Sequence, residues 1–149
     1  MRAVVQRVSH ASVSVDGNVT GSISRGLVVL LGVEIGDGED AAKQIAEKIL
    51  NLRVFPDGTE LMNRSIRDVA GSVLLVSQFT LLGDARKGRR PSFIRAAREE
   101  AAKPLYELVG ALIERAGTSV SYGIFGAHMN VVLVNDGPVT ILLDTNKVF

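Results

Sequence analysis

The C-terminal part of the chain is built around one stretch, Val131-Val132-Leu133-Val134-Asn135-Asp136-Gly137-Pro138-Val139-Thr140-Ile141-Leu142-Leu143. Its two apolar runs are rich in β-branched residues, which is typical of strands. Asp136-Gly137 between them favours a tight turn, and Pro138 then removes a backbone donor. Because an X-Pro bond in such a turn is a candidate for the cis isomer, we expect two strands joined by a turn with a cis Gly137–Pro138 bond.

Upstream of this stretch, strand-like runs alternate with amphipathic helices. The run 27–31 is apolar throughout and predicts a strand that is buried on both faces. Apolar residues at helical spacing predict two helices, one over 39–52 and one that has Pro104 in its first turn and ends at Gly117. Further strands are predicted over 4–8, 11–15, 19–23, 73–76, 119–122 and 129–134. We therefore expect a single compact α/β domain over residues 1–149, with largely antiparallel sheets and flanking helices.

Composition excludes several classes of protein. The 149 residues include no cysteine, which rules out disulfides, thiolate zinc sites and a cysteine nucleophile. The two histidines, His10 and His128, are too few for a histidine-rich metal site. The family resemblance described below implies that no metal or organic cofactor is needed. The chain begins without a signal-peptide core, and no apolar run is long enough to span a bilayer, so we expect a cytoplasmic protein.

Positive charge is concentrated in one loop, although the net charge is only +1. No acidic residue lies between Asp84 and Glu99, and Gly88 would let the backbone approach a ligand closely. The loop carries the candidate RNA-binding residues Arg86, Lys87, Arg89 and Arg90. Two interpretations remain open: a surface that neutralises phosphates, or a basic loop that is only solvated.

Polar side chains follow the predicted strand 73–76, in the segment Ser77-Gln78-Phe79-Thr80. A serine or threonine nucleophile needs a base, and neither a Gly-x-Ser-x-Gly elbow nor an evident Ser-His-Asp set is present. His128 could serve as the base, although a lone histidine beside a strand is commonly structural, and His10 has no better claim. From these residues alone, Ser77 and Thr80 belong either to a catalytic site or to ordinary strand-end hydrogen bonds.

Several segments together resemble the D-aminoacyl-tRNA deacylases. The resemblance covers essentially the whole chain, in order, and departs from the family pattern at Ile124 and His128. The segments that carry it are Val5-Gln6-Arg7-Val8, Gly26 to Val33, Ser77-Gln78-Phe79-Thr80-Leu81, Lys87 to Phe93, Phe125-Gly126-Ala127 and Asn135-Asp136-Gly137-Pro138-Val139-Thr140.

The resemblance implies an enzyme that hydrolyses the ester bond of D-aminoacyl-tRNA, or of glycyl-tRNA, in translation quality control. It implies a homodimer with active sites at the subunit interface and with tRNA as the partner. Gly137 and Pro138 would present carbonyls to the partner's site and reject L-amino acids, and Phe125 and Met129 would contact the substrate.

The resemblance also places catalysis in the segment Ser77, Gln78, Phe79 and Thr80. Thr80 would act as a nucleophile, or Thr80 and the Phe79 backbone would position the ester while the 2′-hydroxyl of the tRNA assists the attack. We favour the second mechanism because no base is recognisable for Thr80. An RNA-binding module without catalysis and a conventional serine or threonine hydrolase remain the rival interpretations.

Overall fold

A computed structural model describes residues 1–149. The elements follow one another as β1 (Arg2–Val15), β2 (Asn18–Ile23), β3 (Gly26–Gly32), α1 (Glu39–Asn51), β4 (Phe55–Pro56), β5 (Met62–Arg64), β6 (Ser72–Ser77), the 3₁₀ helix η1 (Phe79–Leu82), α2 (Glu99–Arg115), β7 (Val120–Tyr122) and β8 (Asn130–Asp144). Neither α-helix has the length and hydropathy of a membrane-spanning segment.

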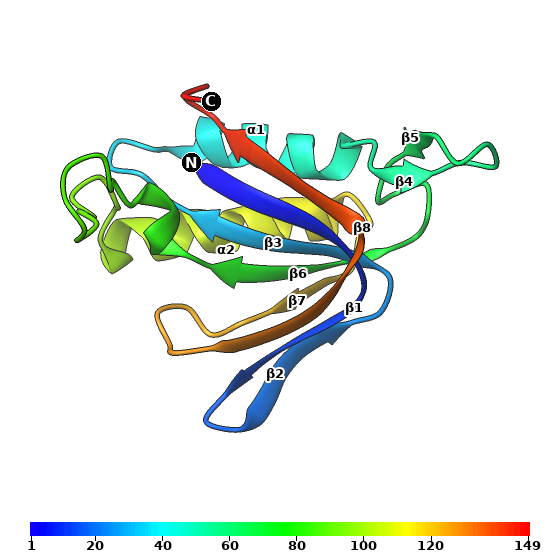
Figure 1. Ribbon diagram of the computed structural model, residues 1–149, viewed down its shortest axis with the longest axis horizontal. Helices are drawn as coiled ribbons and strands as arrows, with labels where there is room; N and C mark the ends of the chain where they lie inside the picture. The colour runs from blue at the N-terminus through cyan, green and yellow to red at the C-terminus, as the bar shows by residue number, and fades with distance from the viewer.

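One mixed sheet organises the molecule, and β1 lies at its centre (Figure 1). β1 pairs antiparallel with β2, β3 and β8. β3 and β6 are parallel, as are β6 and β7, and β4 and β5 form a separate two-stranded hairpin. The expected α/β fold is confirmed, and the antiparallel pairing around β1 is accompanied by two parallel pairs that the sequence did not indicate.

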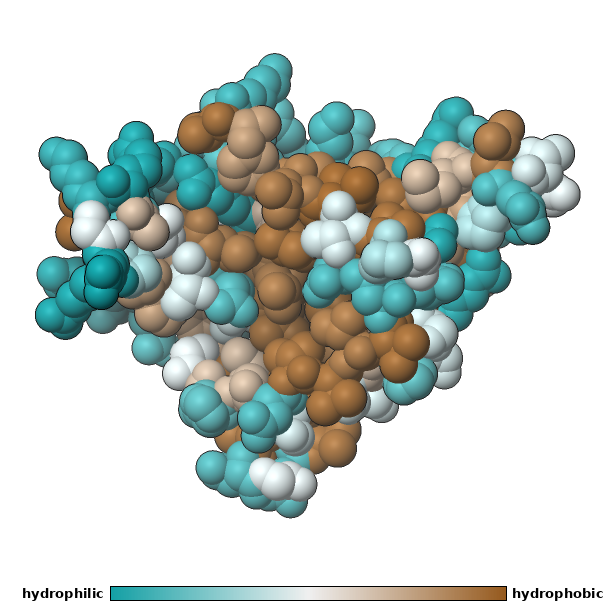
Figure 2. Space-filling model, in the orientation of Figure 1, coloured by the Kyte–Doolittle hydropathy of each residue, from teal (hydrophilic) through white to brown (hydrophobic).

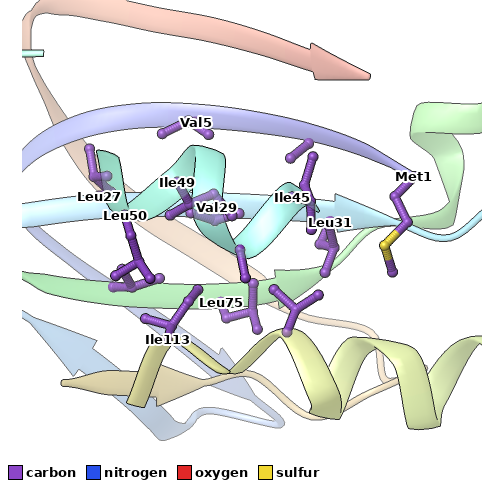
Figure 3. Packing of buried hydrophobic residues seen from close by; sticks show 14 of the residues in the cluster. Met1, Val5, Leu27, Val29, Leu31, Ile45, Ile49, Leu50, Leu75 and Ile113 are labelled. Carbon is purple, nitrogen blue, oxygen red and sulfur yellow. The ribbon is translucent and has the colours of Figure 1, made fainter. Parts of the chain in front are cut away.

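The core consists of two apolar clusters on opposite faces of the sheet. Leu27, Val29 and Leu31 of β3 pack with Ile45 and Ile49 of α1 and with residues of α2, and each is at most 1% exposed. Figure 3 shows these side chains between the sheet and the helices. The intervening residue of β3, Val28, belongs to the second cluster, with Val8, Ala11, Val13, Ile23, Leu74 and Val76. The prediction that this strand is buried on both faces is confirmed.

The two strands predicted over 4–8 and 11–15 are one strand, β1. Its first half pairs with β3 and its second half with β2, while β8 runs along its other edge. Ser9 and His10 are exposed, and the register with β8 shifts on either side of Val8. The polar interruption in the sequence therefore marks a change of partner rather than a turn.

The predicted turn at Asp136-Gly137 is wrong, because the chain continues in one direction through β8. Residues 130–135 pair with 8–14 of β1, and residues 140–144 pair with 2–6 of the same strand. Between these two ladders, the single residue Arg7 faces the four residues 136–139, which bulge out of the sheet. The Gly137–Pro138 peptide bond is cis, as predicted.

The second helix begins earlier than predicted. α2 starts at Glu99, so Pro104 lies inside the helix rather than in its first turn. Pro104 has no N–H to donate to the carbonyl of Glu100, but Glu100 is exposed and water can hydrate that carbonyl. The carboxylates of Glu99 and Glu100 also lie at the positive end of the helix dipole, which favours a start at this point.

Candidate active site

The polar segment Ser77–Thr80 is held at the end of the buried strand β6. Ser77 pairs with Leu31 of β3, and the next amide, Gln78 N, donates to the Leu31 carbonyl at 2.8 Å. The chain then tightens into η1, which lies directly over β3. Gly32 permits this approach, because a β-carbon there would lie 2.8 Å from the Gln78 carbonyl oxygen.

A cavity of about 360 Å³ opens at this strand end. Its walls come from η1, the start of α2 and the loop that leads into β8. The cavity brings together six of the residues proposed from sequence: Ser77, Gln78, Phe79, Thr80, Phe125 and Met129. Concave and largely apolar sites with a few convergent polar groups are typical of ligand pockets.

No carboxylate or imidazole is hydrogen-bonded to the Thr80 hydroxyl in this cavity. The Thr80 hydroxyl is exposed and accepts a hydrogen bond from the side-chain amide of Gln78. An amide cannot remove a proton from a hydroxyl at neutral pH, whereas an activated threonine requires an adjacent base. The arrangement therefore suits a threonine that donates to or orients a substrate.

An aromatic contact supports the apolar wall. The ring of Phe125 meets the edge of Tyr106 from α2 at a centroid distance of 5.4 Å. The Tyr106 hydroxyl donates to the Leu75 carbonyl at 2.8 Å, and burial raises the pKa of Tyr106 above its ordinary value. The phenol consequently stays protonated and fixes the ring beneath Phe125. Tyr106 is a site residue that was not predicted from the sequence.

Two ionisable side chains, Glu99 and His128, also line the cavity. His128 was recognisable from the sequence, whereas Glu99 was not, because the helix was predicted to begin near Pro104. Both side chains are exposed, so they lie at the rim. They add charge and hydrogen-bonding capacity beside the hydroxyl and amide groups.

The basic loop is closed at its base beside the cavity. Asp84 and Ser92 exchange two backbone hydrogen bonds of 2.8 and 2.9 Å, and Phe93 meets the edge of Phe79 at a centroid distance of 5.2 Å. The contact between the two rings joins the loop to η1. Through this contact, the loop is positioned next to the residues that line the cavity.

One of the four candidate RNA-binding residues is already neutralised. Arg86 makes two side-chain hydrogen bonds of 2.9 and 2.6 Å to Asp84, and these bonds hold the pKa of the Asp84 carboxyl well below its ordinary range. Lys87, Arg89 and Arg90 are exposed and form no ion pair. Three cations of the loop are thus free to meet an anionic ligand.

Gly137 and Pro138 do not line the cavity of their own chain. They are exposed in the bulge of β8, beside Arg7. Arg7 Nε donates to the Asp136 carbonyl at 2.9 Å, and a second guanidinium nitrogen donates to the Val54 carbonyl at 2.6 Å. The residues proposed from sequence therefore occupy two separate places within one chain.

Comparison with known proteins identifies the family. The family described as D-Tyr-tRNA(Tyr) deacylase matches residues 4–144. The chain belongs to this family. Among curated relatives of the deacylase family, the proteins from Koribacter versatilis and Fervidobacterium nodosum are 60% and 57% identical over all 149 residues and cover 100% of each chain. Both are named D-aminoacyl-tRNA deacylase.

Solved structures agree with this assignment of fold. A protein named c-Myc DNA Unwinding Element Binding Protein superposes with a TM-score of 0.92 at 40% identity, over 97% of this chain and 99% of its own. A probable eukaryotic D-amino acid tRNA deacylase superposes with a TM-score of 0.81 over 95% and 97% of the two chains. Its identity of 17% supports the shared deacylase fold alone.

Proposed function

We propose that the protein hydrolyses the ester bond of D-aminoacyl-tRNA, releasing the free D-amino acid and tRNA. The observation that carries this proposal is the cavity at the end of β6, which gathers Gln78, Phe79, Thr80 and Phe125 in a member of the D-Tyr-tRNA(Tyr) deacylase family. Curated relatives that are 54–60% identical over 97–100% of the chain are all named for this activity.

The chemistry we propose does not use an acyl-enzyme. The Thr80 hydroxyl and the Phe79 backbone N–H hold the ester carbonyl and stabilise the negative charge that develops on its oxygen. Water attacks the carbonyl with help from the 2′-hydroxyl of the terminal adenosine, and the 3′-oxygen leaves with a proton. The Gln78 amide supports this role because it fixes the Thr80 hydroxyl without deprotonating it.

A homodimer completes the proposed site. β8 is a 15-residue strand whose outer edge is unpaired, and Val132, Val134 and Leu142 on it are 60%, 46% and 55% exposed. Figure 2 shows a band of apolar surface down this face of the molecule. A long apolar edge strand invites pairing with a second copy. In the dimer, Gly137 and Pro138 of one protomer enter the cavity of its partner.

We propose that these two residues provide the chiral filter. Their carbonyls grip the α-amino group that every substrate shares, and they leave no room for a substituent on the L side of the α-carbon. Glycine has no substituent to exclude, so glycyl-tRNA passes the filter and is hydrolysed. Phe125 and Met129 form the wall against which the accepted substrate lies.

In this proposal the protein binds tRNA through the phosphates of the tRNA. The reaction takes place in the cytoplasm. Lys87, Arg89 and Arg90 are exposed beside the cavity and free of ion pairs, which suits contacts to the sugar-phosphate backbone. Substitution of Arg89 by Gln should weaken binding of different tRNAs equally and lower the salt dependence by about one phosphate contact. Binding that is indifferent both to salt and to this substitution would contradict the assignment.

A nucleic-acid-binding role without catalysis is the second candidate. The exposed basic loop favours it, as does the name of the relative that is 40% identical, which refers to a DNA element. The cavity beside the loop favours the hydrolase over this second candidate. A protein that only binds nucleic acid would not need the hydroxyl and amide groups of Thr80 and Gln78 in such a cavity.

Time courses with D-Tyr-tRNA, L-Tyr-tRNA and Gly-tRNA test the proposed function. The purified protein should release tyrosine from the D ester and glycine from Gly-tRNA, and it should spare the L ester at the same enzyme concentration. Binding of all three tRNAs without release of an amino acid would establish the second candidate instead.

A further inference from the structure

A second basic cluster lies far from the 84–92 loop in sequence, where α1 ends and the β4–β5 hairpin begins. Its members, all exposed, are Lys48, Arg53, Arg64 and Arg67. Two of them, Arg53 and Arg67, line a hollow of about 480 Å³ together with Asn51, Ser65 and Asp68. Lys48 lies beside Arg53 at an adjoining hollow, and Arg64 donates to the carbonyl of Asp68. No apolar side chain lines this hollow, so it is suited to a charged ligand rather than an apolar one.

The positive charge of this cluster is only partly offset within the chain. The ion pairs of the protein involve other cations, so none of the four basic side chains has a carboxylate partner. The acidic residue in the hollow, Asp68, accepts hydrogen bonds of 2.7 and 2.8 Å from the backbone and hydroxyl of Ser65. Glu47 lies beside Lys48 and Arg53 at an adjoining hollow. Among the residues that line the 480 Å³ hollow itself, Arg53 and Arg67 face the single acid Asp68, so the hollow keeps a net positive charge.

A short series of contacts connects the cluster to the proposed chiral filter. Arg53 precedes Val54, whose carbonyl accepts a hydrogen bond from Arg7, and Arg7 also binds the Asp136 carbonyl. Figure 1 shows the β4–β5 hairpin beside the bend of β8. If the bulge of one protomer enters the partner's cavity, these contacts bring Arg53 of that protomer toward the same cavity.

We propose that Lys48, Arg53, Arg64 and Arg67 form a second phosphate-binding surface, which holds the backbone of the tRNA whose 3′ end occupies the partner's cavity. This inference rests on the proposed function. Guanidinium groups and an amide are donors that match phosphate oxygens. The hollow has no aromatic side chain for stacking on bases, so the contact is to the backbone and independent of sequence. Each tRNA then bridges the two subunits.

The test measures binding of uncharged tRNA to the Arg53→Gln/Arg67→Gln double variant as a function of salt. The slope of log K against log [salt] should fall by about one for each phosphate that is no longer neutralised, and the affinity at low salt should fall severalfold. In steady-state deacylation, KM should rise while kcat stays near that of the wild type. Arg53→Lys/Arg67→Lys should recover most of the slope, because the slope reports the number of neutralised phosphates and Lys keeps the positive charge.

Lys147→Gln provides a control, since Lys147 is also exposed and unpaired but follows β8, beside Met1 at the end of the sheet opposite the hollow. It should leave the slope unchanged. The inference is overturned if the double variant binds tRNA with the wild-type slope, or if the Lys147 variant lowers the slope equally. Failure of the proposed function is distinguishable: the wild type would then bind tRNA with a normal salt slope but release no D-amino acid.

Discussion

At the scale of single residues, the central feature is that Thr80 has an amide, not a base, as its hydrogen-bond partner. The contact with Gln78 orients the hydroxyl toward a role as a donor. A nucleophilic threonine would instead require a group that accepts its proton. The two roles differ in what loss of the hydroxyl should do: loss of a donor slows the reaction, whereas loss of a nucleophile removes the covalent route.

Replacement of Thr80 by Ala should reduce deacylation without abolishing it. Loss of one donor to a developing oxyanion typically slows a reaction by about 100- to 1000-fold, whereas loss of a nucleophile removes the covalent route. A tRNA that ends in 2′-deoxyadenosine should be a poor substrate for the wild type. Single-turnover kinetics on both substrates checks these rates, and isolation of an acyl ester on Thr80 would contradict them.

Replacement of Tyr106 by Phe tests the support beneath Phe125. The substitution removes the hydrogen bond to the Leu75 carbonyl, but that carbonyl still accepts from Gly123 N at 3.1 Å, so no buried acceptor is left unpaired. The free energy of unfolding should therefore fall by only about 1 kcal/mol. Urea denaturation measures the change, and a loss several times larger would show that the phenol does more than fix the ring.

At the scale of elements, the β4–β5 hairpin is closed by one carboxylate. Asp57 accepts hydrogen bonds from the hydroxyl of Thr59, the side chain of Asn63 and the backbone N–H of Thr59, at 2.6, 2.7 and 2.7 Å. These bonds stabilise the ionised form and lower its pKa from 3.8 to about 2. The hairpin carries part of the second basic cluster, so its closure positions that surface.

The lowered pKa of Asp57 gives the hairpin a defined pH dependence. Because the folded-state pKa lies below the unfolded value of 3.8, this stabilisation is complete above pH 3.8 and is lost as the pH falls toward 2. Amide exchange in the hairpin should accelerate over that range, and Asp57→Asn should remove the pH dependence. An NMR titration giving the Asp57 carboxyl an ordinary pKa would show that these bonds do not persist in solution.

The elements also show what the sequence could and could not predict. Periodicity was sufficient for β3 and α1, because each is packed along a continuous apolar pattern. It failed for β1 and β8, where two apolar runs flank a polar interval. Such a pattern looks the same whether the chain reverses or bulges, and the choice is made by pairing with a distant strand.

The residues of the candidate site also divide into those that the sequence could predict and those that it could not. Polar residues after the buried strand β6 were recognisable from sequence, and so was the basic loop. Glu99 was not, because the start of α2 depends on how the chain packs after the loop and not on the position of Pro104. Tyr106 lies inside the predicted helix, but its contact with Phe125 depends on tertiary packing. The separation of Gly137 from the cavity was likewise invisible until the direction of β8 was known.

At the scale of the whole molecule, one chain carries every proposed part of the site but does not bring the parts together. The cavity lies at the end of β6, while the Gly137–Pro138 bulge lies beside Arg7 on β8. The exposed edge of β8 offers a surface on which a second copy can bind. The central claim is therefore that each active site is shared between two subunits.

Mixed dimers test this claim most directly. One subunit carries Ala127→Trp, which fills its cavity. The other carries Gly137→Leu, which prevents its bulge from entering the partner's cavity. Each homodimer should be inactive on D-Tyr-tRNA. After mixing and reassociation, half of the dimers pair an open cavity with an intact bulge, so activity should recover to about a quarter of the wild-type value. Differently tagged subunits show whether the mixed dimers have formed. If they have formed and the mixture stays as inactive as the parent homodimers, the result contradicts a shared site.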